Sequence, residues 1–517
     1  MNVFRTKSVE QSMRDTEEPG HRLRRRLGPL DLTVFGVGVI VGTGIFVLTG
    51  VAAGTEAGPA ISLSFVFSGI ACALAALCYA EFASTVPVAG SAYTFSYATL
   101  GEIIAWIIGW DLILELALGG STVAVGWSQY LATVLKDFHI AVPSSIIGDS
   151  PTVNVGAAAI VLILTGVLCL GVKLSSRVNF VIVAIKLGIV LFVIIAGAFY
   201  VKTRLWHPFI PPSGSKPAPG GAESNTTPLI QTLFGYKAGA FGWSGIFSGA
   251  ALVFFAYIGF DIVATAAEET KKPQRDLPIG ILASLAICTV LYVAVSLVVT
   301  GMVPYNKIST AAPLAEAFRA VGHPNFATVV AIGALAGLTT VMLILMLGQS
   351  RIFFAMSRDR LLPSGFSRVS ERYGTPYLST IITGVVVAAI AAFVPLTSLA
   401  ELVNIGTLFA FVVVSVGVVV LRHTHPDLPR AFRTPLVPLV PILSVAACIW
   451  LMLNLPDQTW IRFAVWMAIG LVIYALYGVR RSRVGNGDGA YPADRSKPGL
   501  RPGVRPAPAR GGAARRR

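Results

Sequence analysis

Two apolar segments of the chain carry glycines near their centres, where an interrupted helix would present its backbone to a ligand. The first covers residues 36–46 and reads GVGVIVGTGIF, and the second covers residues 254–261 and reads FFAYIGFD. A broken helix frees N–H groups at the start of its second half and carbonyl groups at the end of its first half. The N–H groups attract a carboxylate, and the carbonyls accept hydrogen bonds from an ammonium group. A site with both recognises a zwitterion, and the commonest small zwitterion is an α-amino acid.

The two segments assign the ends of this zwitterion to particular backbone groups. Gly42 and Gly259 mark the predicted helix breaks, and glycine lets a ligand approach the backbone without a Cβ in the way. The carboxylate would bind the amides of Thr43, Gly44 and Ile45. The ammonium would bind carbonyls near Ile40 and those of Phe255, Ala256 and Ile258. The alternative is two continuous helices in which glycine only permits close helix packing.

The composition indicates the solvent in which these segments fold. The residue types AVILMFWYC make up 55% of the 517 residues and charged residues make up 13%, about half of the roughly 25% typical of soluble domains. So few charges cannot cover a large water-exposed surface, and the bilayer is therefore the expected solvent. The net charge is +15, with basic residues gathered near both chain ends, which favours contact with anionic lipid. Secreted enzymes, nucleic-acid binders and disordered proteins are excluded.

Apolar stretches of about 20 residues, the length needed to cross a bilayer, occur twelve times. They cover residues 31–53, 58–83, 101–134, 154–173, 178–201, 243–267, 278–301, 325–350, 377–396, 399–421, 437–455 and 460–479. With both chain ends on one side, 31 Lys and Arg residues fall on that side and 8 on the other. Because cytoplasmic loops are enriched in Lys and Arg, both termini are expected in the cytoplasm. The sequence predicts an all-α polytopic protein of the plasma membrane with twelve transmembrane helices.

The glycine-containing segments lie in the first and sixth spans, which suggests two related halves. Span one runs outward and span six inward, so residues 31–201 and 243–421 would form inverted repeats that each begin with a discontinuous helix. Two further helices at residues 437–479 would complete a membrane domain over residues 31–480. Residues 1–30 would form a cytoplasmic segment. Residues 481–517, rich in Pro, Gly, Ala and Arg, would form a disordered basic cytoplasmic tail.

Residues 36–50 and 254–281 resemble the amino acid–polyamine–organocation superfamily, and most closely its cationic amino acid transporter family. Residues 87–93 (PVAGSAY) and 348–363 agree with this resemblance, which extends over residues 22–480, although Arg360 stands where the family pattern has glycine. The resemblance implies a five-plus-five inverted repeat with two further helices. It also implies secondary transport by alternating access around a central amino acid site. By the same motifs, the substrate contacts would be Ile40, Thr43, Gly44, Phe255, Ala256 and Ile258.

Lys186 lies eight residues inside the fifth span, where an ammonium group costs at least about 2.5 kcal/mol to insert. It would be structural if it only donates hydrogen bonds to backbone carbonyls. It would be a proton-coupling site if a conformational change altered its surroundings. The resemblance favours coupling, since related transporters have a lysine here where sodium-coupled relatives bind sodium between spans one and eight. We therefore expect Lys186 to face the carbonyls of residues 38–41, and the candidate partners are Thr339, Thr340 and Glu115.

Met342, Leu345 and Met346 share one face of span eight through their i, i+3 and i+4 spacing. If this face meets the substrate side chain, the pocket is apolar and favours neutral amino acids over arginine or lysine. Otherwise the three side chains serve helix packing.

The function favoured by these patterns is a proton-coupled amino acid permease, a symporter. The first alternative is a sodium-coupled or exchange-only carrier of amino acids or polyamines, although polyamines lack a carboxylate and would leave the span-one amides unused. The second is a membrane sensor without transport. The chain contains no HExxH, GxSxG or Walker sequence, so we expect neither an enzyme nor a cofactor or metal. We expect no nucleic acid partner, and the sequence leaves the particular amino acid and the oligomeric state open.

Overall fold

The computed structural model describes residues 27–85, 91–148, 151–171, 176–215, 227–235, 240–370, 375–428 and 430–482. Over these residues the chain is helical apart from turns, loops and two isolated β-bridges, Leu27 to Thr270 and Pro228 to Pro456. The predicted all-α membrane fold is confirmed. The predicted amino-terminal segment and basic tail fall almost entirely outside the described residues, as do residues 87–90 of the PVAGSAY sequence.

Every predicted span coincides with helical structure. Eight helical stretches of the described chain are long and apolar enough to cross a membrane: Gly44–Thr85, Glu102–Asp137, Phe180–Ala198, Gly242–Ala264, Pro273–Met302, Pro324–Arg358, Leu396–Thr424 and Asp457–Arg481. The shorter apolar helices Pro29–Ile40, Val155–Cys169, Tyr377–Phe393 and Leu439–Leu453 account for the other predicted spans. The first long stretch joins the second half of span one to span two, because the residues between them are helical and turn at Gly58, whose φ is +61°.

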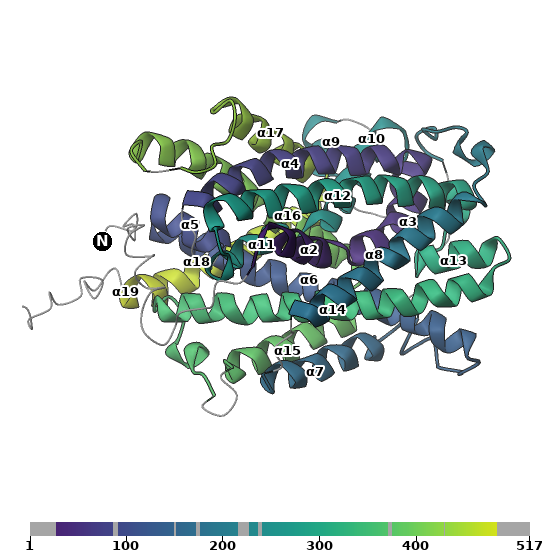
Figure 1. Ribbon diagram of the computed structural model, residues 1–517, viewed down its shortest axis with the longest axis horizontal. Helices are drawn as coiled ribbons and strands as arrows, with labels where there is room; N and C mark the ends of the chain where they lie inside the picture. Colours follow the sequence, from purple (N-terminus) through teal and green to yellow (C-terminus); the bar gives the residue numbers. More distant parts are fainter. Residues whose placement is uncertain are drawn as a thin grey trace, which may run out of the picture.

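The helices are labelled as in Figure 1. The first five spans are α2 (Pro29–Ile40) with η1 (Gly44–Leu48) and α3 (Thr49–Ala52), α4 (Ile61–Thr85), α6 (Glu102–Asp137), α7 (Val155–Cys169) and α8 (Ser176–Ala198). The next five are α10 (Gly242–Val253) with η5 (Phe254–Tyr257) and α11 (Ile262–Thr265), α12 (Pro273–Met302), α14 (Pro324–Arg358), α15 (Tyr377–Phe393) and α16 (Leu396–Thr424). The last two are α17 (Leu439–Leu453) and α18 (Asp457–Ile473), and α18 continues through η9 (Tyr474–Gly478) into α19 (Val479–Arg481).

The connections between spans also contain short helices. They are η2 (Ala53–Ala57), η3 (Gly58–Ala60), α5 (Ser91–Thr99), η4 (Thr203–Trp206), α9 (Leu229–Phe234), η6 (Ala267–Glu269), η7 (Tyr305–Lys307), α13 (Pro313–Ala320) and η8 (Ser364–Ser367). Among these, α5 follows span two and α13 follows span seven.

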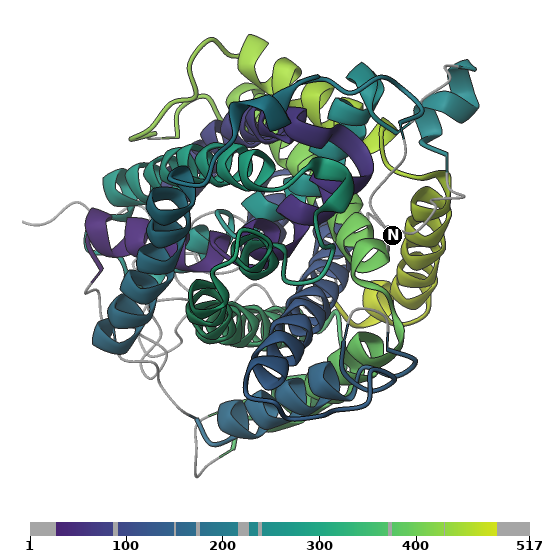
Figure 2. The same ribbon diagram turned by 90° about the vertical axis from the view of Figure 1, so that its right-hand side faces the viewer.

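The long helices form two pairs around the interrupted ones. Helix α6 packs along α14, and α4 packs along α12. Figure 1 shows α2 near the centre of the molecule, where it packs against α12, α8 and α14. Toward the periphery α7 lies along α15, and α17 packs on α16 (Figures 1 and 2). The interrupted spans are therefore enclosed by other helices.

The side chains divide between an enclosed interior and an apolar outer surface. Phe180 and Ile195 of α8, Val385 of α15 and Ile461 of α18 are all more than half exposed. In a membrane-spanning protein such side chains face lipid, whereas polar groups are drawn to the interior, where they find partners. The interior of this protein includes buried Lys186, which lies at the contact of spans one, five and eight.

Candidate functional site

The first helix break lies between α2 and η1. The α-helix ends at Ile40, and Val41 is extended with ψ of 94°. The Gly42 carbonyl accepts hydrogen bonds from the amides of Ile45 and Phe46, both at 3.2 Å. Within the described part of the chain, no backbone acceptor is bonded to the amides of Thr43 and Gly44. These two N–H groups form the free positive end of the second half-helix.

The Thr43 side chain adds a third polar group at this break. Its residue is 1% exposed, and its Oγ1 has no hydrogen-bond partner among the described residues. A buried hydroxyl normally has a partner. The hydroxyl is therefore a third candidate donor to a bound carboxylate, beside the two amides.

The second break lies between η5 and α11. Ile258 is extended with ψ of 135°, and Gly259 has a φ of +116°, a conformation that favours glycine. The Phe255 carbonyl accepts a hydrogen bond from the Ile258 amide at 3.2 Å, so the turn itself uses one of the carbonyls predicted for the ammonium. Asp261 Oδ1 accepts a hydrogen bond from the Gly259 amide at 3.3 Å, and this bond stabilises the start of the second half of span six.

A span-ten asparagine that the sequence analysis missed holds the end of α10. Asn404 Nδ2 donates to the carbonyls of Ala251 and Leu252, at 2.7 and 3.0 Å. Carbonyls at a helix end have no intrahelical partners, and the Asn404 amide donates the missing hydrogen bonds from a neighbouring span. An asparagine inside an apolar span is the signal that could have identified it.

The two breaks touch each other. A Cβ placed on Gly44 would lie 2.2 Å from Ala256 Cα, and a Cβ on Gly259 would lie 2.5 Å from Val39 Cγ1. The break in span one therefore packs directly on the break in span six. Span eight closes one side, since a Cβ on Gly42 would lie 3.3 Å from Val341 Cγ2.

Tyr292 of α12 bridges the two breaks. Its hydroxyl lies 2.7 Å from the Ile40 carbonyl and 2.8 Å from the Ala256 carbonyl, two of the groups predicted to bind an ammonium. A hydroxyl has one proton, so it can donate fully to only one carbonyl at a time. The sequence analysis missed this residue, although a buried tyrosine within a span needs a hydrogen-bond partner.

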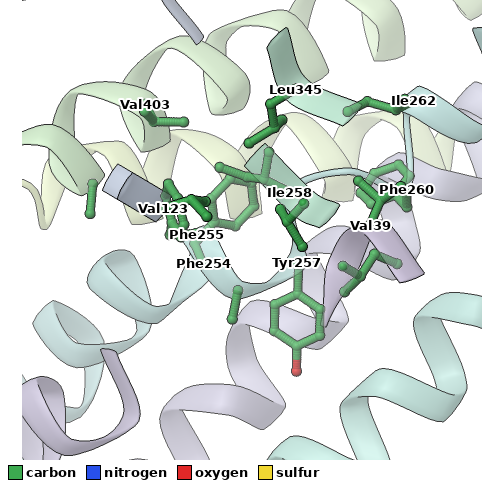
Figure 3. Close-up of a cluster of buried hydrophobic side chains, with 14 of the residues drawn as sticks. Val39, Val123, Phe254, Phe255, Tyr257, Ile258, Phe260, Ile262, Leu345 and Val403 are labelled. Atoms are coloured by element: carbon green, nitrogen blue, oxygen red, sulfur yellow. The ribbon is translucent and has the colours of Figure 1, made fainter. Parts of the chain in front are cut away.

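An apolar cluster adjoins the breaks. Figure 3 shows Phe255 and Ile258 of the second break among Val123 of α6, Leu345 of α14 and Val403 of α16. All five are at most 9% exposed. The other predicted pocket residues, Met342 and Met346, are also buried. A Cβ on Gly119 of α6 would lie 3.5 Å from Leu345, so Gly119 faces span eight, whereas a Cβ on Gly120 would lie 3.5 Å from Val387 of α15 and 3.9 Å from Met346.

Lys186 lies between spans one and eight. Its Nζ donates to the Gly38 carbonyl at 2.6 Å, and a Cβ on Gly337 of α14 would lie 3.1 Å from its Cγ. The hydroxyls of Thr339 and Thr340 donate to carbonyls of their own helix, at 2.7 and 2.8 Å. Thr339 also accepts from Trp127 Nε1 at 3.0 Å. The ammonium thus holds the end of the first half of span one.

Glu115 lies with other acids rather than with Lys186. It interacts electrostatically with Asp261 of span six and Asp111 of its own helix, and all three residues are at most 3% exposed. Asp111 lies against span ten, since a Cβ on Gly406 would be 2.6 Å from its Oδ1. Three buried acids of spans three and six therefore lie near one another, and Asp111 packs against span ten.

A comparison with protein families assigns most of the chain. The sequence profile of the family described as amino acid permease matches residues 27–475. That range contains both helix breaks and every span from α2 to α18.

Individual relatives align with most of the chain. A branched-chain amino acid permease of Bacillus subtilis (strain 168) is 47% identical over 492 residues, which cover 93% of this chain and 99% of the relative. A methylthioribose transporter of the same organism is 45% identical over 486 residues, with the same coverage. A vacuolar cationic amino acid transporter of Arabidopsis thaliana is 39% identical over 430 residues, covering 82% of this chain and 68% of the relative.

Proposed function

The chain belongs to the amino acid permease family, and from this premise we propose that it carries neutral α-amino acids across the plasma membrane by proton-coupled alternating access. It is a multi-pass membrane protein of a transporter family. The observation that carries the proposal is the direct contact of two helix breaks that offer amides and carbonyls to one ligand. We also propose that both termini lie in the cytoplasm, on the basis of the Lys and Arg distribution.

The carboxylate would bind at the start of the second half of span one. The amides of Thr43 and Gly44 are the free donors there, and Thr43 Oγ1 is an unpartnered buried hydroxyl within the described chain. Donors at a helix start favour an anion. Ile45 would contribute less, because its amide already donates to Gly42.

The ammonium would bind the carbonyls that Tyr292 bridges. Because the single tyrosine proton cannot fully satisfy both Ile40 and Ala256, one carbonyl can take an N–H from the substrate while the hydroxyl remains on the other. The Ile258 carbonyl is a further acceptor in this proposal. The amino group would therefore join both halves of the protein when it binds.

The side chain of the substrate would enter the apolar cluster of spans three, eight and ten. No charged residue is among the labelled cluster members, and Leu345, Met342 and Met346 are uncharged. A cationic side chain would find no partner among these residues and would have to reach Glu115, the buried acid about one turn from Gly119 on α6. Leucine and similar aliphatic amino acids fit this chemistry, as the name of the Bacillus branched-chain permease suggests for that relative.

Methylthioribose is the second candidate substrate, because a relative of 45% identity carries that name. It has an apolar methylthio group but neither a carboxylate nor an ammonium. It would leave the Thr43 and Gly44 amides without the anion that they favour. This argument makes an amino acid the first choice.

Proton coupling would act through Lys186. Its ammonium holds the Gly38 carbonyl in the closed arrangement described here, and loss of the proton would reduce this attraction and free the first half of span one to move. A fixed ammonium between spans one and eight would also disfavour a sodium ion there. The sodium-coupled and exchange-only mechanisms remain the alternatives that the experiment separates.

The test is uptake of radiolabelled leucine, alanine, arginine, putrescine and methylthioribose into proteoliposomes in sodium-free buffer, with and without an inward proton gradient. Wild type is compared with Lys186→Ala and with Lys202→Ala, an exposed lysine beyond the other end of the same span. We expect gradient-driven uptake of leucine and alanine that only Lys186→Ala loses. Uptake of methylthioribose alone would refute the amino acid proposal, and gradient-independent uptake would refute coupling through Lys186.

A further inference from the structure

Two short helices occupy matching places in the two halves of the chain. Helix α5 lies between the second and third spans, and α13 lies between the seventh and eighth. With the proposed topology, α5 is at the cytoplasmic end of the molecule and α13 at the outer end. Helix α5 therefore connects two spans of the first half on the cytoplasmic side, and α13 connects two spans of the second half on the outer side.

Helix α5 is anchored to the other half of the protein. The Tyr93 hydroxyl donates to Asp359 Oδ2 at 2.7 Å, and Asp359 directly follows α14, the eighth span. Both residues are at most 5% exposed. On its opposite side α5 packs on span two, where the Phe95 ring stacks on Phe82 with centroids 5.4 Å apart.

Helix α13 is anchored in the matching way. Arg319 forms an ion pair with Asp137, the last residue of α6, the third span. Thr328 Oγ1 donates to the other oxygen of Asp137 at 2.7 Å. At its amino end, α13 packs closely on span one, where a Cβ on Gly50 would lie 2.2 Å from Pro313 Cβ.

We propose that Asp359 and Asp137 are counterpart anchors that hold these two helices shut as the inner and outer lids of the substrate site. Each anchor joins the lid of one half to the end of a long span of the other half. Opening one face breaks its own anchor and leaves the other intact. The inference rests on the proposed alternating access, and it adds the residues that keep each face closed.

The closed state of both lids agrees with the burial of the candidate site. Ile40, Thr43 and Ala256 are each at most 2% exposed, while both anchors are formed. The site is therefore closed to both sides in the described structure. A conformation open on one side requires one anchor to separate.

The two anchors differ in chemistry, which makes them separable. The outer one is an ion pair whose side chains are 23% and 15% exposed, so salt screens it. The inner one is a buried hydrogen bond from a neutral hydroxyl to a carboxylate, which salt hardly affects. High ionic strength should therefore loosen the outer lid selectively.

The test measures lid opening without relying on a known substrate. Leu314→Cys places a thiol on the buried face of α13, and a membrane-impermeant maleimide is added outside to right-side-out proteoliposomes, with the native cysteines as measured background. In this background Arg319→Gln should raise the labelling rate about two- to fivefold, the range for a partly exposed ion pair. Tyr93→Phe should lower it about tenfold, because inward opening depletes the outward-open state.

Matched controls keep the result specific to the anchors. Glu316→Gln removes the other carboxylate that pairs with Arg319, inside α13, and leaves the Arg319–Asp137 pair in place. Thr99→Val removes a hydroxyl that donates to the Phe95 carbonyl within α5. We expect each control to change the labelling rate of Leu314→Cys less than the anchor variant of the same helix does. Labelling changes of the same sign for Arg319→Gln and Tyr93→Phe, or no labelling in any variant, would overturn the inference. Opposite shifts in a protein that takes up none of the five substrates would instead retain the anchors and reject the proposed transport function.

Discussion

The contact between the two helix breaks can be tested by adding one methyl group. In Gly44→Ala the new Cβ would lie 2.2 Å from Ala256 Cα and 2.3 Å from Ala256 Cβ. Carbon atoms pack at about 3.5–4.0 Å, so one break must retreat by roughly 1.5 Å. Both partners are backbone or short side chain, so no flexible group can yield. Overpacking of this kind costs about 1–3 kcal/mol.

The same displacement should affect function more than stability. It separates the amide of Gly44 from the carbonyl of Ala256, which are proposed to bind opposite ends of one small ligand. Misplacing a binding group by about 1 Å can lower the activity of a preorganised site on the order of a hundredfold. We predict that proteoliposomes with Gly44→Ala retain less than about 5% of wild-type leucine uptake at equal protein content, with folding checked by size-exclusion chromatography.

Gly166→Ala and Gly188→Ala are the matched controls. They lie in α7 and α8, and a Cβ on either would meet nothing within 4 Å. Each should keep normal uptake and gain up to about 1 kcal/mol of helix stability. Near wild-type uptake by Gly44→Ala would refute the view that the two breaks form one site.

Two further predictions concern the groups that hold the breaks. Tyr292→Phe leaves the carbonyls of Ile40 and Ala256 without their shared donor, at about 1–3 kcal/mol for a buried unsatisfied group. Without ligand, its apparent melting temperature should be lower than that of wild type. Leucine should raise it by more than it raises that of wild type, because the three N–H donors of the ammonium can satisfy the freed carbonyls. An equal rise in both proteins would count against the ammonium site. Asn404→Ala removes the donor to two carbonyls at the end of α10, and it should lower the apparent melting temperature in the presence and absence of leucine alike, as thermal unfolding in detergent would show.

The helix breaks were predictable because their signal is local. Glycines at 42, 44 and 259 interrupt otherwise apolar periodicity, and the breaks fall between α2 and η1 and between η5 and α11. Lys186 was also conspicuous, since a lysine inside a span needs an internal partner, and its bond to Gly38 lies within the predicted range of carbonyls. Residue type and depth in a span are enough for such inferences.

The groups that bridge the breaks were not predictable in the same way. Tyr292 meets Ile40 across 252 positions of sequence, and Asn404 meets Ala251 across 153. No periodicity in one helix reports which carbonyl of another helix a side chain will meet. The lid anchors share this property, because Asp137 and Asp359 end long spans, where the sequence reads only as helix termini and solvated charge.

The central claim is that one site formed by two helix breaks recognises both ends of an α-amino acid. It is tested most directly by equilibrium binding to the purified protein of leucine, 3-methylbutylamine, which lacks the carboxylate, and 4-methylpentanoate, which lacks the ammonium. The account predicts that each analogue binds at least about tenfold more weakly than leucine, since each leaves charged hydrogen bonds unmade. Binding of either analogue as tightly as leucine would contradict it.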